Sequence, residues 1–142
     1  MVSKVLLDTD ILSELLRGRS PAVRDRVASY LKQHDALTIC SLTVAEIVKG
    51  LEKRAAPAQA KRFRDALPSM EVIGFGLGAA MLAGKIFAAL DQVGQPIGRI
   101  DPLIAATAIH ERLALATGNV AHYRRIQELG FDLSIEDWKT QG

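Results

Sequence analysis

One short stretch of sequence, KVLLDTDIL at residues 4–12, decides the fold of this chain. Three apolar residues follow Lys4 and predict a short buried strand, and Asp8 stands directly where that strand ends. From Ile11 to Leu16 the apolar residues recur at helical spacing, so a helix follows almost at once. A strand that passes directly into a helix is typical of α/β proteins.

The same alternation of short apolar runs and longer amphipathic segments continues along the chain. After the strand at 4–7, we expect strands at 36–41, 71–75 and 114–117. We expect helices at 11–16, 21–34, 43–53, from 57 onward, at 78–93, 101–113 and 119–129. Parallel strands need helical crossovers and are buried on both faces, so this pattern predicts an α/β fold around a parallel sheet.

Composition limits the chain to one ordinary globular domain. With 142 residues, 49% hydrophobic and 24% charged, residues 1–142 can form a single domain with its own core. Cys40 is the only cysteine, so an internal disulfide is impossible, and its apolar surroundings predict a buried side chain. Charges interrupt the apolar residues near the N-terminus and at Lys85, which predicts a cytoplasmic protein without a membrane span.

The polar residues of most interest come at the ends of the predicted strands. Asp8 follows the first strand, Glu46 lies in the first turn after the second, Asp101 begins the helix before the fourth, and Asn119 follows the fourth. In a parallel sheet, ligands bind beyond the carboxyl ends of the strands. These four side chains are therefore expected at one edge of the sheet.

Three carboxylates crowded together repel one another unless a cation neutralises them. Oxygen ligands without a Cys or His pattern suit Mg²⁺ or Mn²⁺ rather than Zn²⁺. Such an ion activates water and stabilises the charge that develops on a phosphodiester under attack, so metal-assisted phosphoryl transfer is the indicated reaction class.

Helix capping offers a simpler explanation for some of these residues. Thr43 and Glu46 have the spacing of a capping box, Asp101 can be the N-cap before Pro102, and Asn119 can be the N-cap of the last long helix. Asp8 is harder to explain as a cap alone. An acid directly after a buried first strand more often marks a site in this architecture.

Four segments together resemble the PIN-domain family, especially the VapC-type toxins of bacterial toxin–antitoxin pairs. The segments are residues 6–12, 42–47, 97–108 and 116–119, and the ending at 135–138 is also similar to several members. They occur in the family's order and cover nearly the whole chain. The resemblance implies a three-layer α/β/α fold, with a short central parallel sheet flanked by helices and an acidic pocket that holds Mg²⁺ or Mn²⁺ and cleaves RNA.

The resemblance also assigns roles to single residues. Asp8, Glu46 and Asp101 match the three central acids of the family, which implies that they are catalytic and bind the metal. Asn119 matches the fourth position, which is aspartate in many relatives, so it joins this catalytic and metal-binding set. The neutral amide favours one tightly held ion over two.

Four neighbours of these residues match or depart from the family pattern. Thr117 matches a hydroxyl residue that supports this corner of the site, and Asp10 is expected to orient Asp8 or a metal-bound water. Gly118 stands where relatives often have a larger polar or basic residue, which removes a possible phosphate contact. His122 is expected to have a surface or capping role rather than to act as a general base.

The implied reaction is hydrolysis of an RNA phosphodiester by a metal-activated water, leaving a 5′-phosphate and a 3′-hydroxyl. Lys49 and Arg99 are the basic residues that we expect to position the RNA backbone. The family resemblance further implies a homodimer and a complex with a VapB-type antitoxin, a small protein whose C-terminal segment blocks the pocket.

Three other functions fit part of the pattern. A degenerate PIN-like module that binds RNA or protein without cleaving it is kept open by Asn119, although the three acids are intact. Asp8 and Asp10 also fit the first motif of haloacid-dehalogenase-type phosphatases, with Asp8 as nucleophile, but the later paired acids and lysine are not clear. A response-regulator receiver needs an aspartate ending its third strand, which the region after Pro57 does not supply.

Overall fold

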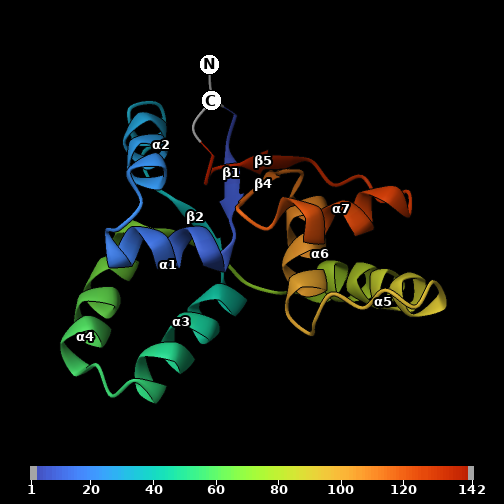
Figure 1. Cartoon of the computed structure of the whole chain (residues 1–142), viewed down its shortest axis with the longest axis horizontal. Helices are drawn as coiled ribbons and strands as arrows, with labels where there is room; N and C mark the ends of the chain where they lie inside the picture. The colour runs from blue at the N-terminus through green and yellow to red at the C-terminus, as the bar shows by residue number, and fades with distance from the viewer. Residues whose placement is uncertain (1–2, 141–142) are drawn as a thin grey trace.

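A computed structural model describes residues 3–140 of the chain (Figure 1). The strands are β1 (Val5–Leu7), β2 (Thr38–Cys40), β3 (Glu71–Ile73), β4 (Ala114–Thr117) and β5 (Ile135–Asp137). The helices are α1 (Thr9–Arg17), α2 (Pro21–Leu31), α3 (Ser41–Lys53), α4 (Pro57–Ala66), the 3₁₀ turn η1 (Leu67–Ser69), α5 (Leu77–Gln92), α6 (Asp101–Glu111) and α7 (Val120–Glu128).

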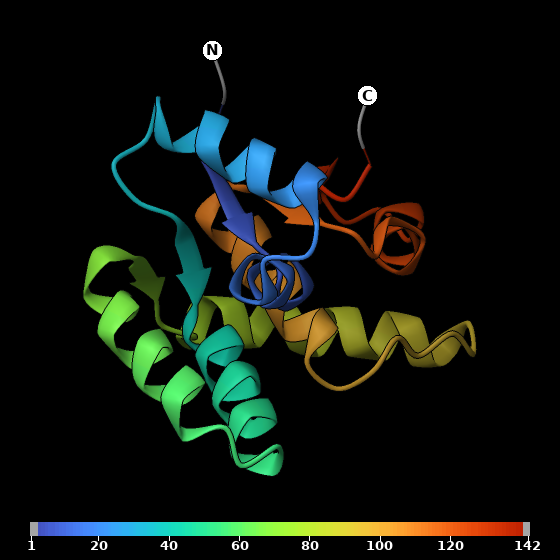
Figure 2. The same cartoon turned by 60° about the vertical axis from the view of Figure 1, so that its left-hand side comes forward.

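The strand pairings within residues 3–140 are all parallel, as the sequence predicts. β1 pairs with β4 and β4 with β5, while β2 pairs with β3. β1 also lies beside β2, so the strands run in the spatial order β3-β2-β1-β4-β5 (Figure 2). The carboxyl ends of all these strands therefore face one edge, where the candidate site residues were expected.

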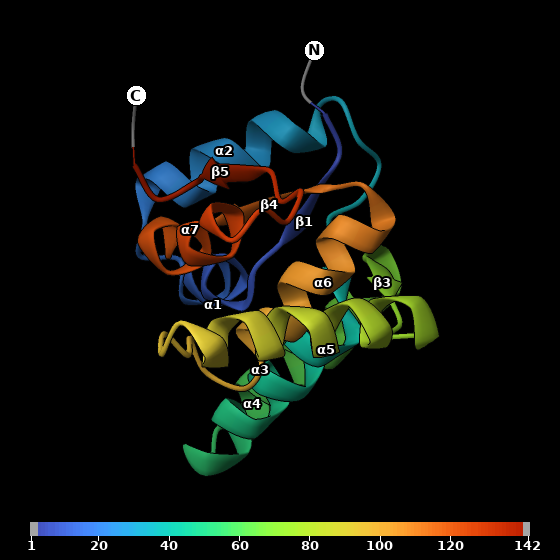
Figure 3. The same cartoon turned by 90° about the vertical axis from the view of Figure 1, so that its right-hand side faces the viewer.

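Helices cover the strands on both sides, which confirms the three-layer α/β/α fold. In Figure 1, α1 to α4 lie on one side of β1 and α5 to α7 on the other, the side that Figure 3 faces. Val5 and Leu7 pack toward the first group, whereas Leu6 between them packs toward the second. The short strand is thus buried on both faces. No helix within residues 3–140 is long and apolar enough to cross a membrane.

Two of the predicted helix caps are wrong. α3 begins at Ser41 with Cys40 as N-cap, so Thr43 lies inside the helix and forms no capping box with Glu46. α6 begins at Asp101 itself, and Ile100 is the N-cap, one residue earlier than predicted. Both acids are therefore free of the capping roles that offered the simpler explanation for them.

Strand β5 is absent from the predicted elements. Its residues, Ile135–Asp137, include only one apolar side chain, which is too short a pattern to separate a strand from a loop. β5 forms because its backbone pairs with β4, a partner distant in the sequence. This pairing brings Asp137 beside Thr117.

The core packing of α1 gives a direct test of the fold. Leu12 is fully buried, whereas Leu16 on the same helix is 44% exposed. We expect Leu12→Ala to lower the free energy of unfolding by about 2 to 5 kcal/mol, because it leaves a cavity against the sheet. Leu16→Ala should cost less than about 0.5 kcal/mol. Urea denaturation measures both, and equal losses would contradict this packing.

Candidate active site

Asp8 is placed by the junction of β1 and α1. Its backbone N–H donates to the Ala116 carbonyl at 2.9 Å, which continues the β1–β4 pairing by one residue. Its side chain caps α1 by accepting from the Thr9 N–H at 2.9 Å. Asp8 is only 2% exposed, so a carboxylate stands buried at the carboxyl edge of the sheet.

Three donors from separate parts of the chain hold the Asp8 carboxylate. The Thr9 N–H and the Tyr123 hydroxyl, 3.0 Å away, donate to Oδ1, and the Thr117 hydroxyl donates to Oδ2 at 2.8 Å. A carboxylate has about four acceptor positions, so roughly one stays free for another ligand. The side chain is thus fixed in orientation and still able to bind.

Burial and neighbouring acids disfavour the charged form of Asp8. Burial, followed by the negative charge of Asp10, raises the pKa of Asp8 to about 7, and the charge of Asp101 adds to the effect. The hydrogen bonds from Thr117 and Thr9 act in the opposite direction. The site therefore attracts either a proton or a cation.

Asp101 lies in the first turn of α6 and meets two residues of α7. Its Oδ2 is 2.9 Å from His122 Nδ1, and the Tyr123 hydroxyl interacts with Asp101 as well as with Asp8. Burial raises the pKa of Asp101, while the nearby His122 opposes this shift. His122 is thus a partner of Asp101, a contact that the surface or capping role expected for it did not include, and its side chain stays 35% exposed.

Tyr123 joins the two acids and was not singled out from the sequence. It is fully buried, and its pKa is raised far above the ordinary value, first by burial and then by the charge of Asp8. The only signal in the sequence is its place four residues after Asn119, one helical turn away. That spacing is too common to indicate a site.

Asp10 contacts Thr117 and Gly118, beside Asp8. Asp10 Oδ2 accepts from the Gly118 N–H at 3.0 Å, and its Oδ1 is 3.5 Å from the Thr117 hydroxyl. Thr117 Oγ1 in turn accepts from the Asn119 N–H at 2.9 Å. Asn119 itself is exposed and is the N-cap of α7, as predicted, but its side chain makes no capping bond.

Glu46 reaches the site through Thr9. The Thr9 hydroxyl donates to Glu46 Oε1 at 2.6 Å and lies 3.0 Å from the Thr43 hydroxyl, while the Thr9 N–H bonds Asp8. Asp8, Asp10 and Asp101 interact electrostatically with one another, whereas Glu46 stands on the α3 side of Thr9. Glu46 also lines a groove with Arg17 of α1 and Arg54 after α3.

The chemistry of these groups fits an oxygen-bound divalent ion. Within residues 3–140, no three His, Cys, Asp or Glu side chains already surround one point as metal ligands. Even so, Asp8, Asp10 and Asp101 place three mutually repelling carboxylates together at low exposure, and a hard cation relieves that repulsion. Mg²⁺ and Mn²⁺ suit such a donor set.

Comparison with known proteins agrees with this fold. A family model described as the PIN domain matches residues 5–128, and the chain belongs to the PIN-domain family. The match leaves the haloacid-dehalogenase-type alternative without support.

Two curated relatives indicate which group of PIN-domain proteins this chain belongs to. The tRNA(fMet)-specific endonuclease VapC of Salmonella typhimurium is 29% identical over 136 residues, covering 95% of this chain and 98% of that protein. Ribonuclease VapC1 of Haemophilus influenzae (strain R2866) is 31% identical over 141 residues, covering 94% and 96%. Within the PIN-domain family, the chain is a member of the VapC ribonucleases.

Solved structures show the same fold. VapBC2 from Rickettsia felis, bound to a DNA fragment from its promoter, matches with a TM-score of 0.82 at 26% identity, covering 96% of this chain and 99% of that one. DNA-bound VapBC from Salmonella typhimurium matches with a TM-score of 0.82 at 28% identity and the same coverage.

Removing the Thr117 hydroxyl tests the electrostatics of Asp8. Thr117→Val keeps the shape of the side chain but removes a hydrogen bond that stabilises the charged carboxylate, so the pKa of Asp8 should rise above about 7. Carbon-13 NMR titration of the Asp8 carboxyl in EDTA measures it. Thr107→Val, which removes an equally buried hydroxyl bonded to the Leu103 carbonyl, is the control. An unchanged or lower pKa in Thr117→Val would show that this bond does not set the titration.

Proposed function

We propose that this chain is a divalent-metal-dependent endoribonuclease and the toxin of a toxin–antitoxin pair. The observation that carries the proposal is the cluster of Asp8, Asp10 and Asp101 at the carboxyl edge of the sheet, where burial and mutual repulsion raise the pKa of Asp8 to about 7. Buried carboxyl groups that repel one another destabilise the folded protein, and binding of a cation offsets this destabilisation.

Asp8 and Asp101 are the central metal-binding residues of this proposal, with Glu46 and Asn119 completing the set. A bound Mg²⁺ or Mn²⁺ ion supplies an activated water and stabilises the negative charge that develops on the phosphodiester. Thr117 fixes the orientation of the Asp8 carboxylate through its 2.8 Å hydrogen bond.

The residues of α7 support the two central acids from the other side. Tyr123 donates to Asp8 and interacts with Asp101, which fixes the spacing between the two carboxyl groups. His122 orients Asp101 through its 2.9 Å contact. Such outer contacts set the direction and basicity of metal-binding carboxylates.

Two exposed basic residues remain our candidates for contacts with the RNA backbone. Lys49 lies three residues after Glu46 on α3, so both side chains lie on the same face of that helix. Arg99 is exposed two residues before Asp101. Both cations lie within three residues of a proposed site acid in the sequence, and phosphate contacts of this kind supply affinity without reading the RNA sequence.

The proposal includes the partners of the relatives. The matched structures from Rickettsia felis and Salmonella typhimurium are VapBC complexes, which supports a VapB-type antitoxin for this chain as well. We further propose a homodimer, a cytoplasmic location and a cellular RNA as substrate. The name of the Salmonella relative specifies tRNA(fMet), and structured tRNA is the first substrate class to test.

A second candidate function is a PIN module that binds RNA without cleaving it. The observation in its favour is Asn119, a neutral and exposed residue at the fourth position of the expected acidic set. Such a module would bind RNA and leave it intact in the presence of Mg²⁺ or Mn²⁺.

Cleavage of a cellular RNA pool distinguishes the two functions. We expect purified, antitoxin-free wild type to cut specific RNAs with Mg²⁺ or Mn²⁺ and to lose this activity in EDTA. Asp8→Asn and Asp101→Asn should each reduce the rate by about a hundredfold or more, because each removes a charge that holds the ion. Gel analysis and sequencing of the fragment ends measure both the rates and the target.

The matched control is Asp65→Asn, which removes an exposed carboxylate of α4 that pairs with Lys61. Its rate should equal that of wild type. Binding of RNA by the wild type without cleavage at any metal concentration would favour the non-cleaving module.

A further inference from the structure

The segment after β5 is anchored beside the acid cluster. Trp138 is 1% exposed, and its backbone N–H donates to the Thr117 carbonyl at 3.1 Å. Asp137 Oδ1 accepts from the N–H groups of Lys139, at 3.0 Å, and Thr140, at 3.2 Å. The backbone at Lys139 is thus held by its own bond to Asp137 and by the bond of the preceding Trp138 to Thr117.

Gly118 leaves the space through which the Lys139 side chain passes. A Cβ atom at position 118 would lie 2.2 Å from Lys139 Cδ and 2.7 Å from its Cγ, far inside contact distance. The backbone of Gly118 does not need the left-handed region that only glycine enters easily. The close approach of Lys139 is therefore what a larger residue would disturb.

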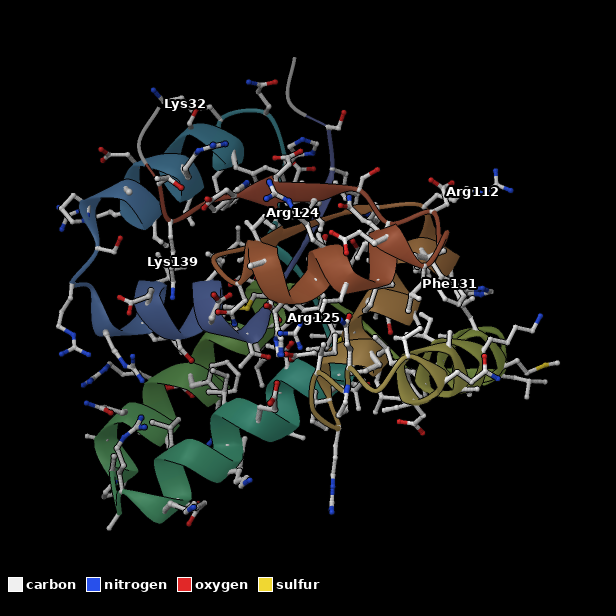
Figure 4. The ribbon with its side chains drawn as sticks, turned by 45° about the vertical axis from the view of Figure 1, so that its right-hand side comes forward. Lys32, Arg112, Arg124, Arg125, Phe131 and Lys139 are labelled. Carbon is white, nitrogen blue, oxygen red and sulfur yellow. The ribbon has the colours of Figure 1, made fainter. Side chains whose placement is uncertain are left out.

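The Lys139 ammonium ends at the rim of the acid cluster. Its Nζ lies 3.4 Å from Asp10 Oδ2, the same oxygen that accepts from the Gly118 N–H. Through Thr117, Asp10 is one residue removed from Asp8. The Lys139 side chain is 39% exposed, and Figure 4 shows it extending from the end of β5 toward α1.

Stability alone does not account for this arrangement. An exposed ion pair contributes about 0 to 1 kcal/mol, and ordering a lysine side chain costs an entropy of similar or greater size. The negative charge of the site offers a second reason for the position of Lys139. A polyanion that approaches Asp8, Asp10 and Asp101 meets repulsion, and a cation at the rim lowers it.

We propose that Lys139 is a substrate-binding residue of this site, whose ammonium contacts a phosphate of the bound RNA beside the acid cluster. In the free protein, the Lys139 stem lies over Gly118 and the ammonium contacts Asp10. When RNA binds, the ammonium leaves Asp10 and contacts a phosphate oxygen. A lysine suits this exchange because its charge is compact and its three donors rotate. The inference rests on the proposed function and names a residue through which the substrate is bound.

Binding is tested apart from cleavage. The probe is a fluorescein-labelled single-stranded RNA of mixed sequence, titrated in Mg²⁺ with the full chain carrying Asp101→Asn, and binding is followed by fluorescence anisotropy at several salt concentrations. Adding Lys139→Ala should weaken binding and make the slope of log K against log salt shallower by about 0.7, the share of one phosphate contact. Lys139→Arg should keep the slope.

Lys32→Ala is the control for a simple loss of positive charge. Lys32 is exposed at the C-terminal end of α2, well away from Lys139 in Figure 4. Its removal changes the net charge by the same amount and should leave the salt slope as it was.

Cleavage by the otherwise wild-type chain gives the second measurement. Lys139→Ala should lower kcat/KM about tenfold, mostly through KM, since a lost charge-assisted phosphate contact weakens ground state and transition state alike. Gly118→Ala displaces the Lys139 stem and should act in the same direction. The double variant should be no worse than Lys139→Ala alone, because the two changes act through one side chain.

The outcomes separate this inference from the proposed function. If RNA binding depends on Lys139 but the wild type does not cleave RNA, the inference is supported and the proposed nuclease function is contradicted. If Lys139→Ala and Lys32→Ala cleave RNA equally well, the inference is overturned and the proposed nuclease function stands. Faster cleavage by Lys139→Ala also overturns it, since Lys139 would then be only an internal counter-ion that competes with the metal. Failure of the Asp101→Asn protein to bind the RNA overturns it as well.

Discussion

The burial of the Asp8 carboxylate is the constraint on which the rest of the site depends. A charged group at 2% exposure is costly unless donors or cations surround it. Here the donors come from the first residue of α1, the end of β4 and the middle of α7. These donors meet at Asp8 because β1 and β4 are parallel neighbours and α7, which follows β4, brings Tyr123 to the carboxylate. The fold and the site are thus one arrangement.

The three hydrogen-bond donors offset only part of the cost of burying the Asp8 carboxylate beside other acids. Asp10 and Asp101 add negative charge beside Asp8. His122 of α7 contacts Asp101, and Lys139, which follows β5, contacts Asp10. The acids are suited to a divalent ion, and the Lys139 ammonium is suited to a phosphate backbone. A nuclease acting on RNA needs both, and this balance links the geometry to the proposed reaction.

The local sequence pattern was enough to predict the alternation of strands and helices, the parallel sheet and the position of Asp8. The spacing of apolar residues in a short window distinguishes strands from helices. The sequence did not indicate β5, Tyr123 or the role of Lys139. Each of these depends on a partner far away along the chain: β4 for the strand, Asp8 for the tyrosine and Asp10 for the lysine. For the caps at Thr43 and Asp101, the strand-to-helix junctions override the local signal.

Calorimetric titration of Mn²⁺ into the full chain and its Asp8→Asn variant tests the central claim most directly, at pH 6 and pH 8 in buffers of different ionisation enthalpy. Because the pKa of Asp8 is about 7, wild type should bind Mn²⁺ with proton release at pH 6 and with little release at pH 8. Asp8→Asn should bind much more weakly at both. Equal binding by the two proteins, or no binding by wild type, would contradict the claim that the buried Asp8 carboxylate holds a divalent ion.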